Sequence, residues 1–431
     1  MAGGFWESQN KARPGAYVNF ETNDQSLNIL DSTGLVVIPL ELDWGDVGKF
    51  IELKPTDKFE ALFGSKLKDL LPIREAYKAT GKVIVYNLNG VGEKATATST
   101  AFIATAIHGG TDGNKINVTV TVGLEGTSTV KTFFKGVQVD SQVVAAVSEL
   151  EANSFATFTG ELPAADATLT LIGGTTVEAT NDSYATLADE LNTQDFKVVA
   201  IGTDDETVKE MFTIKAKEWR SQQGKNVTFV TNNYNTSDHE SVVSILNGVT
   251  LEGGEELTAK DAVYWYAAAY ANSTTNSLTY TAYPGAIDCE RKTHEEIVQA
   301  LRDGHIVYTL NIGRIVVEQD INTYRSFIPE KNRDFSKNKL VRTMDIVSNN
   351  TQFVFSNYFI GKVTNNADGR DLFKQELMKV VLDPLASKGA LEYESGDISI
   401  VQGHDKDSIV VDMAIKFNDV MEKLYMTVNC Q

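Results

Sequence analysis

The segment Gly202-Thr-Asp-Asp205 places hydroxyl and carboxylate groups where a predicted parallel strand ends and a predicted helix begins. Open α/β sheets bind ligands at this point of the fold, so an α/β enzyme or nucleotide-binding protein could use the segment as its site. The segment has neither the dinucleotide-binding glycine pattern nor the phosphate-binding loop. We therefore favour a simpler role for Thr203 or Asp204, which is to cap the N-terminus of the helix.

A second glycine-rich segment, Gly109-Gly-Thr-Asp-Gly-Asn114, has the composition of a phosphate cradle. It leads into a predicted strand rather than a helix, so no helix dipole would face a bound phosphate. We expect a tight loop there, at the start of a β-rich region.

The remaining ionisable residues do not suggest a catalytic set. The pairs Asp204-Asp205 and Glu255-Glu256 are adjacent in sequence, and such neighbours seldom face each other across a substrate. His294, in the first turn of a helix, and His305, at the start of a strand, are interpreted as surface or interface residues. Five scattered histidines and two cysteines offer no zinc-ligand spacing. The spacing of these residues therefore shows no catalytic arrangement, and we expect no metal site and no cofactor.

Length, composition and charge limit the fold and the partners. A chain of 431 residues is too long for one core and predicts roughly two to four domains. Its apolar fraction of 42% and charged fraction of 23% are typical of a globular protein. A net charge of −19 argues against nucleic acid as a partner, because phosphate backbones attract basic surfaces.

The sequence shows no pattern for membrane insertion or secretion. No apolar run reaches the ~20 residues needed to span a bilayer, and Met1–Glu7 lacks the basic and apolar regions of a signal peptide. Cys289 and Cys430 cannot form a disulfide framework and fit a reducing compartment. We therefore expect synthesis in a bacterial cytoplasm.

Strand and helix patterns alternate in two stretches, 21–92 and 181–324, which together predict an α/β core domain. Strands are expected at 35–40, 82–86, 196–201 and 226–230, with a hairpin over 306–318. Helices are expected at 56–64 (capped by Thr56, ended by Gly64), 67–80 (ended by Gly81), 182–191, 205–221, 258–271 and 293–303. The last two begin with the pairs Thr258/Asp261 and Thr293/Glu296, and Gly304 ends the second.

Two further regions complete the predicted fold class, which is multidomain α/β and α+β. Residues 93–180, rich in Thr, Ala, Val and Gly, predict an inserted, mostly β protruding domain, with strands at 116–122, 129–139 and 167–171 and one helix at 143–150. Residues 325–419 predict a C-terminal α+β domain. Its helix, at 369–388, has an apolar face made of Leu372, Phe373, Leu377, Val380 and Val381.

Both ends of the chain have the pattern of extended arms. In the N-terminal arm, residues 1–20, the Pro14-Gly15 turn is followed by a predicted strand at Ala16–Phe20. Residues 408–417 alternate apolar and polar side chains, and the strand pattern resumes in the C-terminal arm, 420–431. A terminal strand needs partners for its backbone N–H and C=O groups. Those partners belong either to the same subunit or to the next one.

The stretch 325–342 departs from the acidic character of the chain. It contains two acidic residues, Glu330 and Asp334, against six basic ones: Arg325, Lys331, Arg333, Lys337, Lys339 and Arg342. Two interpretations remain open, a solvated loop and a patch that docks on an acidic protein surface.

Several segments together resemble the contractile tail-sheath proteins of phages, especially the sheaths of phage-like bacteriocins and defective prophages. They keep the family's order along the chain: Pro14–Val18, Gly110–Val118, Asn276–Thr279 with Pro284–Ala286, Val317–Thr323 and Met421–Val428. Ala16 stands where the family often has Val, and His108 precedes the glycine loop where the family often has Tyr-Pro.

The resemblance implies a structural subunit, not an enzyme. Such sheaths are stacked hexameric rings around an inner tube, and on baseplate triggering they contract and drive the tube through a cell envelope. Other copies of the chain, the inner tube protein and the baseplate and tail-terminator proteins are then its partners. The terminal arms are expected to join the sheets of neighbouring subunits, through Tyr17, Val18 and Phe20 at one end and Leu424, Tyr425, Met426, Thr427 and Val428 at the other.

The resemblance leads us to a hypothesis about the basic stretch. We expect seven cationic residues to face the inner tube of the extended sheath: Lys331, Arg333, Lys337, Lys339, Arg370, Lys374 and Lys379. Two alternatives remain, an α/β nucleotide-binding enzyme that uses Gly202–Asp205 and a self-assembling surface-layer or adhesive protein that uses the β insertion.

Overall fold

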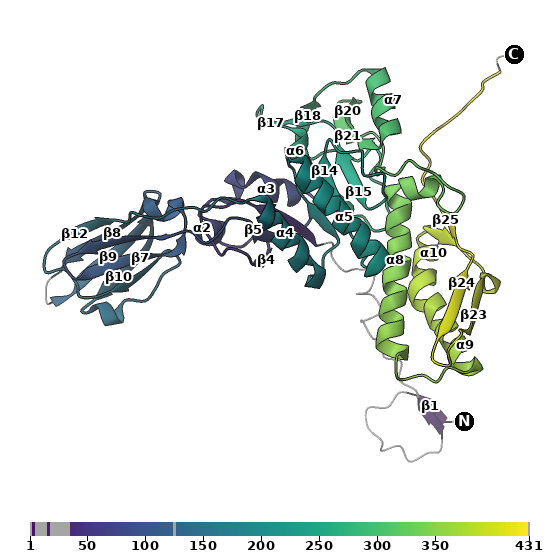
Figure 1. Ribbon diagram of the computed structural model, residues 1–431, viewed down its shortest axis with the longest axis horizontal. Helices are drawn as coiled ribbons and strands as arrows, with labels where there is room; N and C mark the ends of the chain where they lie inside the picture. The colour runs from purple at the N-terminus through teal and green to yellow at the C-terminus, as the bar shows by residue number, and fades with distance from the viewer. Residues whose placement is uncertain (1, 5–14, 18–34, 124–125, 430–431) are drawn as a thin grey trace. The chain divides into compact units, whose positions relative to one another are not determined.

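The computed structural model of the protein describes residues 2–4, 15–17, 35–123 and 126–429 (Figure 1). The described chain forms two compact units. The larger unit contains the described residues of 35–345, residues 388–392 and the chain from Lys416 onward. The smaller unit contains residues 346–387 and 393–415, together with the short strands β1 (Ala2–Gly4) and β2 (Gly15–Tyr17).

A seven-stranded sheet forms the centre of the larger unit. Its strands lie in the order β19-β15-β14-β13-β3-β5-β4, and every pair is parallel except β4 with β5. Their bounds are His305–Ile306 (β19), Val242–Ile245 (β15), Thr228–Asn232 (β14), Val198–Ala200 (β13), Val36–Leu40 (β3), Val83–Asn87 (β5) and Phe50–Leu53 (β4). The predicted strands at 35–40, 82–86, 196–201 and 226–230 are thus confirmed within two residues at either end.

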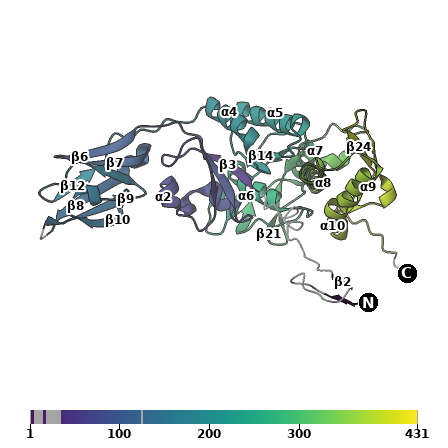
Figure 2. The same cartoon turned by 90° about the horizontal axis from the view of Figure 1, so that it is seen from below.

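Helices cover both faces of this sheet, which explains why its strands are apolar runs rather than alternating patterns. Val37 and Val199 face the helices α4 (Asn181–Glu190) and α5 (Glu206–Gln222). Val36, Ile38 and Val198 face α6 (Ala259–Asn272) and α3 (Leu71–Ala76) on the other side. Figure 2 shows α4 and α5 along one face and α6 along the other.

The predicted helix N-termini are confirmed where the two capping residues lie three positions apart in the sequence. Thr258 with Asp261 caps α6, and Thr293 with Glu296 caps α7 (His294–Asp303). Gly304 ends α7 in a left-handed conformation, with φ of 92°. The hairpin predicted at 306–318 is β20 (Tyr308–Asn311) with β21 (Arg314–Val317), while Ile306 joins the main sheet instead.

Two predicted helix boundaries near the N-terminal end of the core are wrong. Helix α2 (Phe59–Phe63) ends at Gly64 as expected, but Lys58 precedes it and no side chain, Thr56 included, caps it. The helix predicted at 67–80 is a 3₁₀ turn at 67–69 followed by α3, which has Pro72 in its first turn. Proline cannot donate a backbone hydrogen bond to the preceding turn, so the helix restarts there. Gly81 therefore caps no helix.

The inserted β domain contains two sheets around one core. One sheet has the order β10-β9-β8-β12 and the other β11-β7-β6. Their bounds are Val137–Val144 (β10), Ser128–Phe134 (β9), Ile116–Val122 (β8), Ala167–Thr170 (β12), Ala156–Thr159 (β11), Phe102–Gly109 (β7) and Lys94–Ser99 (β6). Trp44, which follows β3 in the chain, packs fully buried into this core.

Two predictions in this domain need correction. The strand expected at 129–139 is a hairpin, because Lys135-Gly136 turns with positive φ at both residues. The helix expected at 143–150 is wrong, since β10 continues through Val143 and Val144 and only a 3₁₀ turn at 147–149 follows. β-Branched residues favour the strand here.

In the smaller unit the helix predicted at 369–388 is divided in three. Helix α9 (Ala367–Glu376) passes into a π-helical stretch at 377–382 and then α10 (Asp383–Ser387). Phe373, Leu377 and Val381 are buried as expected. Leu372 is exposed, which corrects its placement on the apolar face.

The rest of this unit is a helix end and a two-stranded sheet. Helix α8 (Asn338–Val354) begins in the larger unit and ends in this one, and among the described strands β23 (Ile398–Gln402) pairs only with β24 (Ile409–Met413). The strand predicted at 408–417 is therefore divided between β24 and β25 (Lys416–Phe417), which pairs with β22 (Leu391–Glu392) in the larger unit.

The loop at Gly109–Asn114 gives a test of the inserted domain's attachment. Gly110 has φ of 121°, and a Cβ atom there would lie 2.0 Å from the carbonyl oxygen of Asp43. Gly136 also has positive φ (79°) but open space around it. We expect Gly110→Ala to cost at least ~2 kcal/mol more unfolding free energy than Gly136→Ala, measured by urea titration. Equal losses would show that the backbone contact with Asp43 is dispensable.

Candidate functional site: the anchored root of the C-terminal segment

A buried carboxylate lies at the base of the site. Asp320, which follows β21, is 1% exposed. Its two oxygens accept hydrogen bonds from the Tyr266 hydroxyl (2.6 Å), the Leu278 backbone N–H (2.9 Å), Asn338 Nδ2 (3.0 Å) and Arg342 Nη2 (2.7 Å). These donors come from α6, from the loop after α6 and from α8, so one side chain ties three parts of the larger unit together.

Asp320 is ionised in this environment. Burial alone would raise its pKa, but the Arg342 guanidinium and the hydrogen bonds outweigh burial, so the pKa lies below the usual value. Arg342 also stacks 4.5 Å from the ring centroid of Tyr270 and donates to the Asn276 carbonyl at 2.7 Å. A second ion pair follows one turn later in α8, where Asp345 accepts two 2.7 Å hydrogen bonds from Arg220.

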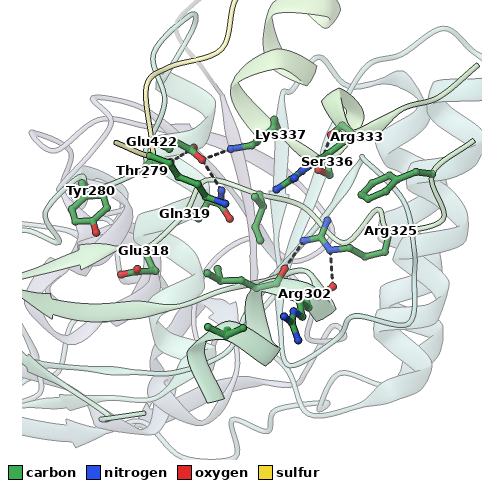
Figure 3. A pocket seen from close by; sticks show the side chains of 15 residues that line it. Thr279, Tyr280, Arg302, Glu318, Gln319, Arg325, Arg333, Ser336, Lys337 and Glu422 are labelled. Carbon is green, nitrogen blue, oxygen red and sulfur yellow. Dashed lines mark hydrogen bonds and ion pairs between the residues drawn. The ribbon is translucent and has the colours of Figure 1, made fainter. Parts of the chain in front are cut away.

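The C-terminal segment is attached beside this network through Glu422 (Figure 3). Its carboxylate accepts hydrogen bonds from Thr279 Oγ1 (3.0 Å), Gln319 Nε2 (2.6 Å) and Lys337 Nζ. Burial would raise the pKa of Glu422, but Lys337 and Gln319 lower it below the usual value. The site therefore holds Glu422 as a partly buried anion.

A second attachment lies four residues earlier. The Asn418 backbone N–H donates to the Ala390 carbonyl at 3.0 Å, and its own carbonyl accepts from Lys339 Nζ. The Asn418 side chain donates to Glu392 at 3.1 Å. We call residues 418–422 the root of the C-terminal segment, because both of its ends are held by polar contacts to the larger unit.

Beyond the root the chain is exposed. Residues 423–429 form no helix or strand in the described structure. Leu424 is 84% exposed, Tyr425 89%, Met426 73% and Val428 69%. Four large apolar side chains so exposed within five residues are unusual for a monomer surface. Residues 423–429, which we call the arm, have the properties of a segment that binds another chain; Cys430 lies outside the described residues.

The basic stretch turns out to be largely engaged within the chain. Lys337 and Lys339 are buried at the root, and Lys331 pairs with Glu240. Arg333 is exposed and forms no ion pair with the described residues.

The other predicted tube-facing residues lie in the smaller unit. Arg370 donates to Asn365 Oδ1 at 2.9 Å, and Lys374 donates to the Ile398 carbonyl at 2.7 Å. Lys379 is exposed. Contact of the seven basic residues with an inner tube stays a prediction.

The N-terminal arm is described only in part. Gly15–Tyr17 forms β2 and pairs in parallel with β1. Val18 and Phe20 lie outside the described residues, and the exchange of this arm stays a prediction.

The segment Gly202–Asp205 forms the start of a helix, and its side chains make contacts within the chain. Asp205 caps α5 by accepting from the Thr207 N–H at 2.8 Å, so the cap is one residue later than predicted. Asp204 pairs with Lys260. A Cβ at Gly202 would lie 2.3 Å from the Lys260 carbonyl oxygen, which shows how closely α6 packs against it.

The other candidate groups are also structural. His305 is buried and shares a 2.8 Å hydrogen bond with Ser244 Oγ, which corrects its interpretation as a surface or interface residue. The glycine-rich segment at 109–114 is a loop with a 3₁₀ turn that leads into β8, as predicted. Among the described residues, no three His, Cys, Asp or Glu side chains are grouped to hold a metal ion. No helix in the described part of the chain could cross a membrane.

Comparison with known families identifies the chain. Three family models match it, each describing part of a phage tail sheath protein: the domain III N-terminal region of tail sheath protein Gp18 at residues 33–88, the central domain at 177–323 and the C-terminal domain at 330–431. The chain belongs to the phage tail sheath protein family. This is a family of structural proteins, not of enzymes.

Individual relatives match this chain over nearly its whole length. The protein XkdK of the phage-like element PBSX of Bacillus subtilis is 32% identical over 99% of both chains. The crystal structure of a sheath tail protein from Desulfitobacterium hafniense is 33% identical, with a TM-score of 0.84 over 96% of this chain and 99% of that one. The sheath of an extracellular contractile injection system, PVC, in its contracted state shares the fold at 10% identity, with a TM-score of 0.53 over 98% of both chains.

Removal of the buried charge of Asp320 should strongly destabilise the larger unit. Asp320→Asn leaves the Arg342 guanidinium buried without its counter-ion, and we expect a loss of about 3–5 kcal/mol in unfolding free energy, measured by urea titration. Asp288→Asn, in an exposed pair with Arg291, should change nothing measurable and serves as the control. Similar stability of the two variants would contradict the role given to Asp320.

Loss of the Glu422 charge should release the root. Glu422→Gln leaves Lys337 without its closest carboxylate, so we expect several-fold faster trypsin cleavage after Lys423. Glu52→Gln, which weakens an exposed pair with Lys82 away from the root, is the matched control and should leave that cleavage unchanged. An unchanged cleavage rate in both variants would show that Glu422 does not hold the root.

The same contact predicts a pH dependence. The pKa of Glu422 is lowered from 4.5, so its contribution to stability is fully present above pH 4.5 and is lost as the pH falls through the lower, folded-state pKa. The stability difference between the wild-type chain and Glu422→Gln should therefore be largest at neutral pH and shrink as the pH falls below 4.5. A constant difference over this range would exclude the ionised Glu422 contact.

Proposed function

We propose that the protein is the subunit of a contractile sheath that polymerises as stacked hexameric rings around an inner tube. Contraction, triggered from a baseplate, drives the tube through a cell envelope. The observation that carries this proposal is the arm, whose apolar side chains are exposed although its root is firmly held. Such an arm is suited to link one subunit to the next.

The acceptor of the exchanged arms is the β23–β24 hairpin in this proposal. The pair has no third strand among the described residues, so each strand has one free edge. Two-stranded sheets are marginally stable alone, and added strands would satisfy the unpaired N–H and C=O groups. Strand exchange would place the arm of one neighbour and the strand around Tyr17 of another against this hairpin.

One face of the β23–β24 hairpin is packed within its own chain. The apolar side chains of an added strand would therefore lie on the opposite, exposed face. Ile398 is buried, whereas Val401 and Val410 are opposite each other on the exposed face, at 52% and 53% exposure. Leu424, Met426 and Val428 alternate along the arm and would share one side of an added strand. They supply the apolar side chains that such an extended sheet would bury.

Contraction requires links that survive a large rearrangement. In the proposed sheath, the root keeps residues 418–422 on their own subunit, while the arm pairs with the neighbour. Rigid units could then rotate about the junction at Lys423 without breaking either contact. Of the seven basic residues predicted to face the inner tube, Lys379 in the smaller unit is exposed, and we expect it to meet the tube in the extended state.

Deletion of residues 424–431 tests the linkage and retains the Glu422 anchor. The truncated chain should unfold at the same temperature as the full chain, because the deleted side chains that the structure describes are exposed. It should form no tubes in electron micrographs, whereas a control with Lys94→Ala, an exposed residue of the inserted domain, should assemble like the wild type. Normal tubes from the truncated chain would refute the exchange of the C-terminal arm.

A further inference from the structure

A pocket of about 680 Å³ lies beside the root and has unusual charge for this acidic chain. Its lining includes five cationic side chains, those of Arg302, Arg325, Arg333, Lys337 and Lys423. Two carboxylates, Glu318 and Glu422, also line it, so the lining carries a net charge of +3. Figure 3 shows three of the arginines gathered on one side of it.

The carboxylates of the pocket are already occupied. Glu422 is bound by Lys337, and Glu318 accepts a 2.6 Å hydrogen bond from the Thr309 hydroxyl. Arg302 and Arg333 are exposed and form no ion pair with the described residues. The excess positive charge therefore belongs to the three arginines and to Lys423, which is also exposed.

Contacts within the chain explain the role of Arg325 in the pocket, but they do not explain that of Arg333. Arg325 donates to the carbonyls of Leu301 (3.1 Å) and Arg302 (3.0 Å), where it caps the C-terminus of α7, an arrangement that the helix dipole favours. Arg333 belongs to a separate 3₁₀ turn and serves no helix end. Burial, with a further contribution from Arg333, lowers the pKa of Arg325 to about 10, while Asp238 and Asp303 act in the opposite direction.

The pocket also has apolar walls. Val298, Leu301 and Ile321 line it, and Phe327 stands at its side with 46% exposure. A free inorganic anion would not use these surfaces. A peptide segment that carries a carboxylate beside an apolar residue fits both parts of the lining.

We propose that this pocket binds an acidic segment of a second copy of the chain. Two observations favour a second copy over other acidic partners. The chain has a net charge of −19, so its copies offer carboxylates in abundance. The pocket is also continuous with the root, since Glu422 and Lys423 line it, and the arm leaves toward a neighbour from there. The inference rests on the proposed function and adds to it a polar contact that is separate from strand exchange.

A charge reversal tests the inference. The double variant Arg302→Glu/Arg333→Glu should raise the concentration needed for tube assembly at least ~tenfold and reduce its salt dependence. Arg314→Glu/Lys94→Glu makes the same charge change at exposed positions outside the pocket and should change that concentration by less than ~twofold. Sedimentation measures the polymer, and circular dichroism verifies that both variants are folded.

A photo-crosslinker gives an independent readout. With p-benzoylphenylalanine in place of Phe327, tubes should yield crosslinked dimers whose second peptide contains Asp or Glu. Crosslinks only to the same chain or to an inner tube protein would overturn the inference, as would assembly unaffected by the double reversal. A wild-type chain that forms no polymer at all would overturn the proposed function as well, which distinguishes the two failures.

Discussion

The contact between the buried carboxylate of Asp320 and Arg342 is the interaction on which the larger unit depends. It joins α6, the segment after β21 and the start of α8 through ionised and neutral hydrogen bonds. Lys337 and Lys339 flank Asn338, which is held by the same carboxylate. The position of both lysines, and with it the attachment of the C-terminal segment, therefore follows from one buried charge that is costly to leave unpaired.

Local rules predicted the elements whose determinants are neighbours in sequence. The capping pairs of α6 and α7 and the clean alternation of 116–122 needed no tertiary information. The predicted helices failed at three places. Pro72 interrupted the helix predicted at 67–80, and pairing of β10 with β9 kept residues 143–144 extended. The π-helical stretch at 377–382 divided the helix predicted at 369–388. In each case packing or chain geometry overrode intrinsic propensity.

The candidate site was less predictable than the fold, because its contacts join distant parts of the chain. The basic stretch was visible in the sequence, but its pairing was not, since Lys337 and Glu422 are 85 residues apart. A carboxylate at 422, within a strongly strand-like terminal pattern, was the available signal. The segment Val317–Thr323 resembled the sheath family, yet only the structure explains it, through the buried Asp320 and the Asn322 and Thr323 side chains.

The path of the chain has a mechanical consequence. After building the smaller unit, the backbone returns to the larger one, and the root is fastened there. Tension applied to a subunit's own arm would be borne by Glu422 and the Asp320 network, both in its larger unit. If the β23–β24 hairpin receives the arm of a neighbouring subunit, that neighbour pulls on the smaller unit. The subunit's own arm then transmits force from the larger unit, to which the root is attached.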